Sequence, residues 1–342
     1  MRPILSSALL VTIVAISGCG RINNNEDAEF PKVIPIGSLS NTFFVPSLNN
    51  DAPSTGNVIY TPVFLFAWNE LRQALGGTFT MEKADKMLQE ADTTTLFKSA
   101  LTPGEYETKV NADDGAVQLS AYFKKALPFI ETMDTVDKGQ PFAFYGYPIK
   151  AFGMLHYNEK IAAQIAILYY RTNDHFIIKI TPKDQAQEVI LAKGLTNERT
   201  LAGLLAETDK LIKVGAAEQK SKMKEDKYRL NPIDQVVIPV LRFNLEKDYT
   251  DFAGTLLHHS KKTNTLLSAT QRTAFVLDEH GAKVESEVTV STDSMPDINI
   301  RRPDLSKLLW FDKPFVVILR KTGISQPYLM MKIENTELMV KR

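Results

Sequence analysis

The stretch that decides the fold begins with Arg272-Thr-Ala-Phe-Val-Leu-Asp278 and continues into Glu279-His280-Gly281. Its apolar and β-branched residues predict a strand, and the glycine predicts where that strand ends. Beyond the glycine an alternating pattern resumes. Ala282, Val284, Ser286, Val288 and Val290 fall on one face, and Lys283, Glu285, Glu287, Thr289 and Ser291 fall on the other. Because successive side chains of a strand point to opposite faces, this period of two predicts a second, half-buried strand.

The second run leads into a long polar stretch that contains Ser294-Met-Pro-Asp297 and Arg301-Arg-Pro-Asp304. Prolines and charges at this density do not fit the interior of a sheet, so the stretch predicts an exposed loop. A segment that is able to form a strand therefore leads directly into an exposed loop.

Patterns elsewhere predict a mixed α+β fold with mostly antiparallel strands. Apolar residues at helical spacing predict helices over residues 57–74, 80–91 and 196–214, the first with Thr61 as its cap and Pro62 in its first turn. Alternating or continuous apolar runs predict strands over residues 116–123, 141–157, 161–170, 176–180, 235–245, 315–320 and 328–333. Lys321-Thr322-Gly323 predicts a hairpin between the last two strands.

The N-terminus carries the features of a secretory signal. Met1-Arg2 is basic, residues 4–16 are mostly apolar, and small residues precede the single cysteine in Ile16-Ser17-Gly18-Cys19. These last four residues resemble the lipobox of bacterial lipoproteins. The resemblance implies a signal peptide at residues 1–18, lipid attachment to Cys19 and membrane binding through that lipid. Gly20 follows the cysteine, which favours the outer membrane of a bacterial envelope and leaves the displaying face open.

Residues 19–56 predict a lipid-anchored flexible tether, because they are rich in Asn, Pro, Ser and Asp and poor in periodic apolar residues. Residues 57–342 then form the folded domain. Once Cys19 carries lipid, the mature chain has no thiol. That excludes a disulfide framework, a cysteine nucleophile and a thiolate metal site.

Charge and motifs point away from nucleic-acid binding and from catalysis. The chain of 342 residues has 40 basic and 40 acidic residues without a basic stripe, which argues against nucleic acid. Its five histidines lack metal-ligand spacing, and the sequence contains neither a phosphate-cradling glycine loop nor a Gly-x-Ser-x-Gly turn. We therefore expect a monomer without cofactor, metal or enzymatic activity.

Several motifs, in their order along the chain, resemble those of the serpins, a family of serine protease inhibitors. They are Asn57-Val-Ile-Tyr-Thr-Pro62, Leu75-Gly-Gly-Thr78, Tyr122-Phe-Lys-Lys-Ala-Leu-Pro-Phe129, Leu277-Asp-Glu-His-Gly-Ala282, Phe311-Asp-Lys-Pro-Phe315 and Pro327-Tyr-Leu-Met-Met-Lys-Ile-Glu-Asn335. Each motif alone is weak, but their shared order makes chance improbable. The resemblance spans residues 57–335 and implies a serpin-like, multi-sheet α+β fold with N-terminal helices and an exposed reactive loop.

The resemblance also implies a mechanism. In inhibitory serpins a protease attacks the loop, and the cut loop then enters the central sheet as a new strand and distorts the protease. Here it implies residues 279–302 as the inserting loop and a serine-type protease as the partner. The implied hinge is Glu279, Gly281, Ala282, Val284, Ser286 and Val288, with Lys283, Glu285 and Glu287 facing outward. The candidate bait residues are Met295, Pro296, Arg301 and Arg302.

The chain departs from the family pattern in three places. Its hinge carries Val284 and two glutamates where the family favours small residues, and Lys125 stands in place of a glycine. The segment from Gly77 to Ala121 is also too short for the helices and strands that the family has there. These departures support a second hypothesis, a non-inhibitory binding or scaffold lipoprotein with the same fold. A third hypothesis, an envelope hydrolase, rests on the compartment alone.

Overall fold

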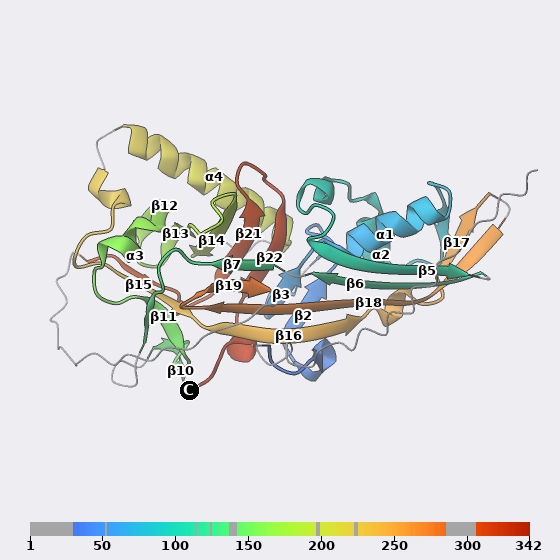
Figure 1. Ribbon diagram of the computed structural model, residues 1–342, viewed down its shortest axis with the longest axis horizontal. Helices are drawn as coiled ribbons and strands as arrows, with labels where there is room; N and C mark the ends of the chain where they lie inside the picture. The colour runs from blue at the N-terminus through green and yellow to red at the C-terminus, as the bar shows by residue number, and fades with distance from the viewer. Residues whose placement is uncertain are drawn as a thin grey trace, which may run out of the picture.

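The computed structural model describes residues 30–51, 53–113, 115–123, 125–136, 142–195, 199–221, 225–260, 262–284 and 306–342. Over these ranges the strands form sheets of nine, seven and four members and one two-stranded hairpin. Figure 1 shows the sheets side by side, with helices at both ends of the molecule. The predicted α+β class is confirmed.

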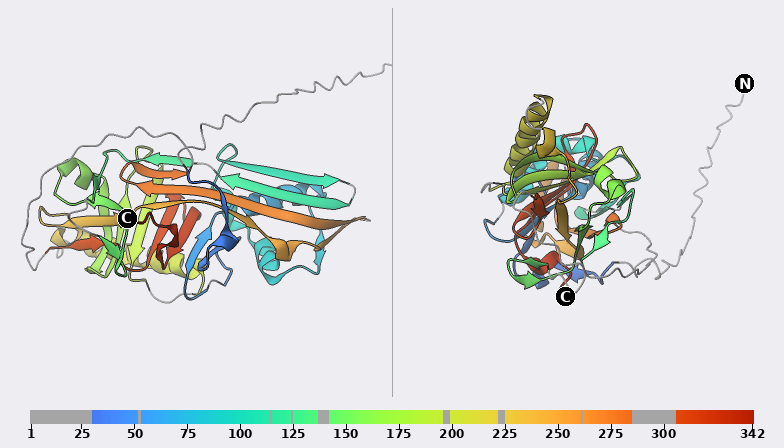
Figure 2. Two further views of the ribbon diagram at one scale, coloured as in Figure 1. Left: turned by 90° about the horizontal axis from the view of Figure 1, so that it is seen from below. Right: turned by 90° about the vertical axis from the view of Figure 1, so that its left-hand side faces the viewer.

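The nine-stranded sheet is organised around one long strand, β18 (Lys262–Asp278). β16 (Leu241–Asp248) pairs with it antiparallel on one side, and β6 (Ala116–Phe123) pairs with it parallel on the other. The remaining members are β1 (Ile34–Pro35), β4 (Thr80–Glu82), β5 (Tyr106–Asp113), β7 (Lys125–Pro128), β17 (Leu256–His259) and β19 (Gly281–Val284). Figure 2 shows β6 beside one part of β18, and β19 between β18 and β7 along the next part.

The other sheets lie beside this one. The seven-stranded sheet has the order β12 (Ile165–Thr172), β13 (His175–Ile180), β14 (Gln187–Lys193), β21 (Phe315–Lys321), β22 (Pro327–Ile333), β3 (Asn57–Tyr60) and β2 (Thr42–Val45). The four-stranded sheet has the order β20 (Leu308–Trp310), β15 (Gln235–Pro239), β11 (Ala151–Met154) and β8 (Asp134–Thr135). The hairpin is β9 (Ala143–Phe144) with β10 (Tyr147–Pro148).

The helices cover the two ends of the molecule. α1 (Val63–Ala74) packs on β5 and β6 beside α2 (Lys86–Thr93), whereas α4 (Leu201–Lys220) packs on β12 and β22 beside α3 (Glu159–Ala163). Short 3-10 turns span Ile36–Ser38, Leu96–Ser99, Glu225–Tyr228, Thr250–Phe252 and Thr336–Leu338. Side-chain caps explain two helix starts: Asp85 accepts a hydrogen bond from the Met87 N–H, and Thr200 accepts one from the Gly203 N–H.

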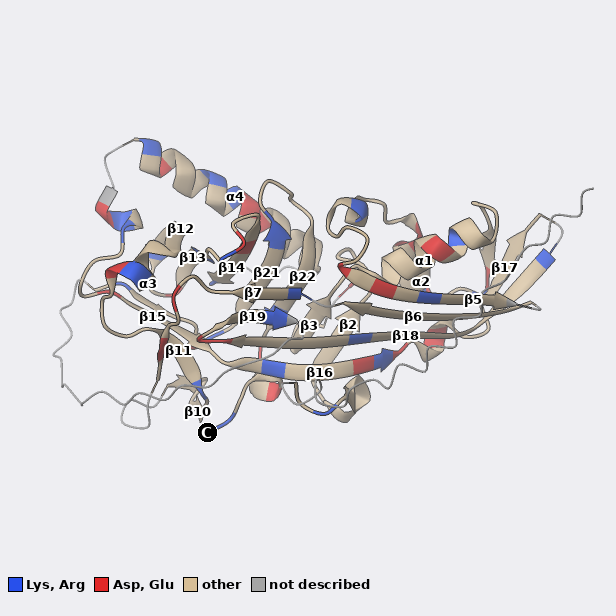
Figure 3. Ribbon diagram, in the orientation of Figure 1, with Lys and Arg blue, Asp and Glu red and all other residues tan. Residues whose placement is uncertain are grey.

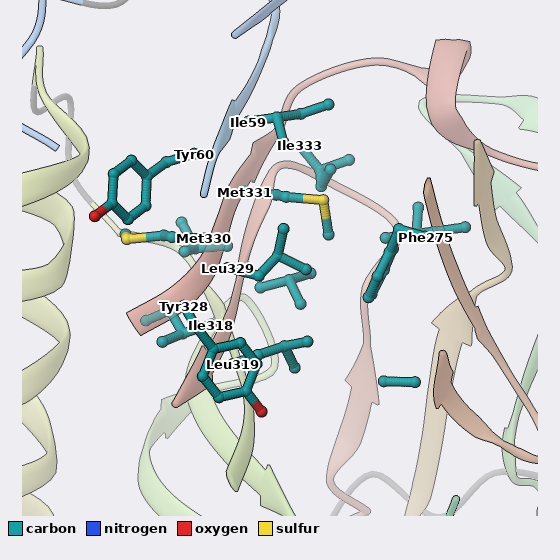
Figure 4. Close-up of a cluster of buried hydrophobic side chains, with 14 of the residues drawn as sticks. Ile59, Tyr60, Phe275, Ile318, Leu319, Tyr328, Leu329, Met330, Met331 and Ile333 are labelled. Carbon is teal, nitrogen blue, oxygen red and sulfur yellow. The ribbon is translucent and has the colours of Figure 1, made fainter. Parts of the chain in front are cut away.

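The main core lies between the nine-stranded and seven-stranded sheets. Figure 4 shows Phe275 of β18 facing Leu329, Met331 and Ile333 of β22. All four side chains are fully buried and belong to one continuous cluster. The inward residues of β18 and β6 are therefore fixed by packing, and the opposite face of these strands points away from this core.

The predicted strands over residues 116–123, 176–180, 315–320 and 328–333 are confirmed as β6, β13, β21 and β22, and the predicted hairpin joins the last two. The first predicted helix begins within one residue of its predicted start at Thr61-Pro62, because α1 begins after Pro62, and residues 57–60, all buried in the seven-stranded sheet, form β3. The second predicted helix begins later than expected. Residues 80–82 form β4, and α2 begins only after the Asp85 cap.

The predicted tether at residues 19–56 is wrong for its described part. β2 pairs in parallel with β3, and Phe44 and Val45 are 4% and 2% exposed. Burial of these apolar side chains outweighs the polar composition around them. Among the helices that the structure describes, none has the length and apolar character needed to cross a membrane.

Candidate functional site at the fork of the central sheet

The nine-stranded sheet divides where β18 changes its neighbour. From Thr265 to Thr273, β18 pairs directly with β6, and the last pair is Thr273 with Phe123. From Val276 to Asp278, β18 pairs instead with β19, and β19 in turn pairs with β7. We refer to the β6–β18 pairing as the seam. We refer to the place where β19 enters between the two strands as the fork. β19 is thus a four-residue wedge between strands that pair directly farther along.

The two sides of the fork share one register. Lys283 of β19 is flanked by Val276 of β18 and by Ala126 of β7. Three residues farther along each flanking strand, Thr273 and Phe123 face each other directly across the seam. As far as the Ser268–Gln118 pair, a strand lengthening from β19 would therefore meet both neighbours in register, without sliding either of them; beyond that pair β18 has one extra residue relative to β6.

The turn between β18 and β19 is docked onto the segment that follows β7. The backbone N–H of Phe129 donates to the carbonyl of His280 (2.8 Å), and that of Met133 donates to the carbonyl of Glu279 (2.9 Å). The Asp278 carboxylate accepts from the His280 N–H (3.0 Å), which closes the turn. These bonds fix the start of β19 in the sheet.

Gly281 is required at this turn. Its φ is 147°, and a Cβ there would lie 2.4 Å from the carbonyl oxygen of Leu127 in β7. Only a glycine lets the two backbones approach this closely. The next residue, Ala282, is 1% exposed and belongs to the main core, so the inward face of β19 begins with a small residue.

The seam is held on both faces. On the outer face, the Arg272 guanidinium of β18 lies 5.4 Å from the centre of the Tyr122 ring of β6. On the inner face, the buried Gln271 side chain donates to the Thr61 hydroxyl (2.9 Å) and accepts from the Tyr249 hydroxyl (3.0 Å). Burial raises the pKa of Tyr249, which keeps its hydroxyl protonated as a donor.

A cluster of charges anchors β7 beside the fork. Glu105 accepts hydrogen bonds from the ammonium groups of Lys125 and Lys321, and the Lys125 ammonium lies 4.9 Å from the centre of the Tyr328 ring. Burial raises the pKa of the Glu105 carboxyl, but bonds from Lys125, Lys321 and Thr102 outweigh burial and lower the pKa to about 2. Figure 3 shows basic positions on both β7 and β19 in the middle of the molecule.

The structure brings together part of the predicted hinge. Glu279 lies in the turn, and Gly281, Ala282 and Val284 lie in β19. Lys283 occupies the outer face, as predicted, but it is 8% exposed and does not project freely into solvent. Cys19, the hinge positions Ser286 and Val288 and the bait candidates Met295, Pro296, Arg301 and Arg302 lie outside the described residues.

Sequence reasoning missed several residues of the site. The sequence places Tyr122 only in a strand motif, and it does not identify Gln271, Tyr249 or Glu105 as part of any site. The one signal in the sequence is the long polar side chain of Gln271, which shares a face of the predicted strand with Phe275 and Leu277. Among the described residues, no group of three or more His, Cys, Asp or Glu side chains gathers as a metal site would require.

No family model matches the chain, and no curated protein matches it. The solved structures that match include a Manduca sexta serpin-12, at 13% identity over 64% of this chain and 56% of that one, with a TM-score of 0.33. A thermophilic serpin in the native state, tengpin, matches at 10% identity over 64% and 55%, also with a TM-score of 0.33. Both of these matched structures are serpins, and this chain is similar to them at low identity.

Thyroxine-binding globulin in complex with thyroxine also matches, at 12% identity over 65% of this chain and 57% of that one, with a TM-score of 0.36. The chain thus spans a little more than half of the length of these structures. By their names, the first of these proteins is a serine protease inhibitor, the second is a serpin, and the third is a thyroxine-binding protein. At these identities and TM-scores the similarity assigns no role to any residue of this chain.

Proposed function

We propose that this protein is a serpin-like inhibitor of a serine-type protease, which it traps when the cut loop of residues 279–302 enters the fork. The observation that carries the proposal is the shared register of β6, β7, β18 and β19. β19 already occupies the first four positions of the additional strand. Insertion then requires only that β6 and β18 move apart.

The hydrogen-bond balance favours insertion once the loop is cut. Opening the seam breaks one interface of eight residue pairs, from Thr265–Ala116 to Thr273–Phe123. A lengthened β19 replaces it with two interfaces, one to β18 and one to β6. Each backbone hydrogen bond contributes about 1 kcal/mol net, so the inserted sheet is the more stable one if the entropy cost of ordering the loop is smaller.

The side chains of the loop suit the positions that they would take. Continued in the register of β19, Ser286 would face Thr273, and Val288 would face Gln271, both on the inward side. The Thr273 hydroxyl is buried and has no hydrogen-bond partner in the described part of the chain, so the Ser286 hydroxyl would supply one. Glu287 would face Arg272 on the outer side, where opposite charges stabilise a cross-strand pair.

The experiment is to incubate the protein with trypsin-, elastase- and subtilisin-like proteases. We expect an SDS-stable complex with at least one of them, and a marked rise in melting temperature after the loop is nicked. Complete turnover of the loop with neither result would overturn the proposal.

Two substitutions separate insertion from loop binding. Ser286→Arg places a charge on the inward face and should abolish the gain in stability, because an unpaired charge in the core is costly. Thr289→Arg places the same side chain on the outer face, opposite Thr270, and should leave the gain intact. Equal behaviour of the two variants would contradict the assigned faces.

The alternative function, a non-inhibitory binding or scaffold lipoprotein, is supported by the closed seam. The uninserted state is stabilised by the eight residue pairs between β6 and β18, by the Arg272–Tyr122 contact and by the hydrogen bonds of the buried Gln271 side chain. If these interactions exceed the gain from insertion, the nicked protein melts at the temperature of the intact one. In either case we propose attachment through Cys19 to the bacterial envelope, which mass spectrometry of the membrane-extracted protein would detect as a lipidated N-terminal cysteine.

A further inference from the structure

A small apolar cluster lies on the outer face of the sheet at the fork. Phe30 packs with Ala274 and Val276 of β18, and the three residues are 7%, 1% and 3% exposed and separate from the main core. Val276 is the partner of Lys283 in β19, and Ala274 directly follows the last seam residue, Thr273. Phe30 therefore covers the part of β18 where the neighbouring strand changes.

Two further contacts hold the segment around Phe30 in place. The carbonyl oxygen of Pro31 accepts a hydrogen bond from the Asn244 side-chain nitrogen (3.0 Å). β1 then pairs in parallel with β16, with Ile34 opposite Leu245. Residues 30–35 thus form a strap along β16 that begins at the fork.

Asn244 connects the strap to the seam. Its side-chain oxygen accepts from Nε of Arg272 (3.0 Å), and it is 3% exposed. The Arg272 guanidinium lies over the Tyr122 ring of β6. A continuous row of contacts therefore leads from Pro31 across β16 and β18 to β6, on the far side of the seam.

We propose that the strap is a lock on the fork: it stabilises the closed seam and must leave β18 before β19 can lengthen. The inference rests on the proposed insertion, because the register of β19 would place Glu285 opposite Ala274, on the face that Phe30 covers. A carboxylate in that apolar cluster is unfavourable. The docked strap and the lengthened strand therefore exclude each other.

The experiment measures amide hydrogen exchange in β6 and in the seam part of β18, in the full, uncleaved chain. We expect Phe30→Ala to speed exchange there by about tenfold or more, since it removes the cover of the fork. Ile34→Ala is the matched control, because Ile34 lies in the same strap but is 38% exposed, and it should leave exchange unchanged. Exchange in Phe30→Ala equal to that of the unmodified chain would overturn the proposal.

A second variant tests the strap independently, in case Phe30→Ala does not fold. Asn244→Asp keeps an acceptor for Arg272 and loses the donor to Pro31, so it should also speed exchange at the seam. A readout of insertion is the uptake of a synthetic peptide with the sequence of residues 285–295, which begins where β19 ends and which we expect to enter about tenfold faster in Phe30→Ala. If no variant takes up the peptide or gains stability on nicking, the proposed inhibition fails, and the exchange rates alone decide whether the strap holds the seam.

Discussion

Phe123 of β6 lies opposite Thr273 of β18 at the last direct pair before the two strands part around β19. Both side chains point into the core and are fully buried. This pair marks the end of the closed seam, and any lengthening of β19 begins by separating it.

A disulfide across the seam should prevent insertion. Ser120 and Thr270 face each other on the outer face, so Ser120→Cys with Thr270→Cys, in a Cys19→Ser chain, can close a bridge between β6 and β18. We expect the oxidised protein to gain no stability on nicking and the reduced protein to regain that response. The matched control is Lys109→Cys with Ser120→Cys, which bridges β5 and β6, a pair that insertion does not open.

Alanine at Gly281 should destabilise the turn of the fork. A Cβ there meets the Leu127 carbonyl at 2.4 Å, and the φ of 147° is strained for any other residue. We expect a loss of about 1–3 kcal/mol in the free energy of unfolding, measured by urea denaturation. Gly37→Ala is the control, because a Cβ at Gly37 meets no atom within 4 Å. A loss of the same size at Gly37 would rule out the steric explanation.

The charge cluster around Glu105 should make stability depend on pH. Its pKa is about 2 in the folded chain against an ordinary value of 4.5, so the folded state favours the charged form. This contribution is fully present above about pH 5 and is lost as the pH falls toward 2. We expect the stability difference between the unmodified chain and Glu105→Gln to shrink from pH 6 to pH 3. A difference that stays constant over that range would show that the charge is not the cause.

Removing the hydroxyl of Thr61 should weaken the support beneath the seam. Thr61→Val leaves the Gln271 amide without the acceptor that now lies 2.9 Å away, in a fully buried place. An unsatisfied buried donor costs about 1–3 kcal/mol, which chemical denaturation can measure. Thr135→Val, at an exposed position of β8, is the control and should change stability by less than about 0.5 kcal/mol.

The sequence was sufficient to predict those helices and strands in which each face is buried, or exposed, along the whole length of the element. β6 alternates between core and outer face, and β21 and β22 are apolar because both of their faces are largely covered. The single helix predicted over residues 80–91 is wrong in its first part, because one apolar pattern runs through both β4 and α2. Asp85, which caps α2 and separates it from β4, acts through a single hydrogen bond, and this bond leaves no trace in the apolar pattern of the sequence.

The site was predictable only in part, for a related reason. Ala282 belongs to an alternating run that predicts a strand, and it lies in β19. Its role as a hinge residue is implied only by the family resemblance. Phe30 and Asn244 act through contacts with residues more than two hundred positions away in the chain. No local pattern encodes such contacts, so only the fold reveals that the strap of residues 30–35 begins over the fork.

The shared register of the fork has a kinetic consequence. As far as the Ser268–Gln118 pair neither flanking strand has to slide, so an entering strand can advance one residue at a time. Each step after the first breaks one residue pair of the seam and forms two new ones. The barrier then lies at the start, where Thr273 and Phe123 separate before any new pair has formed. Substitutions at the fork should therefore change how fast the sheet expands, whereas substitutions near Thr265 should change only how stable the expanded sheet becomes.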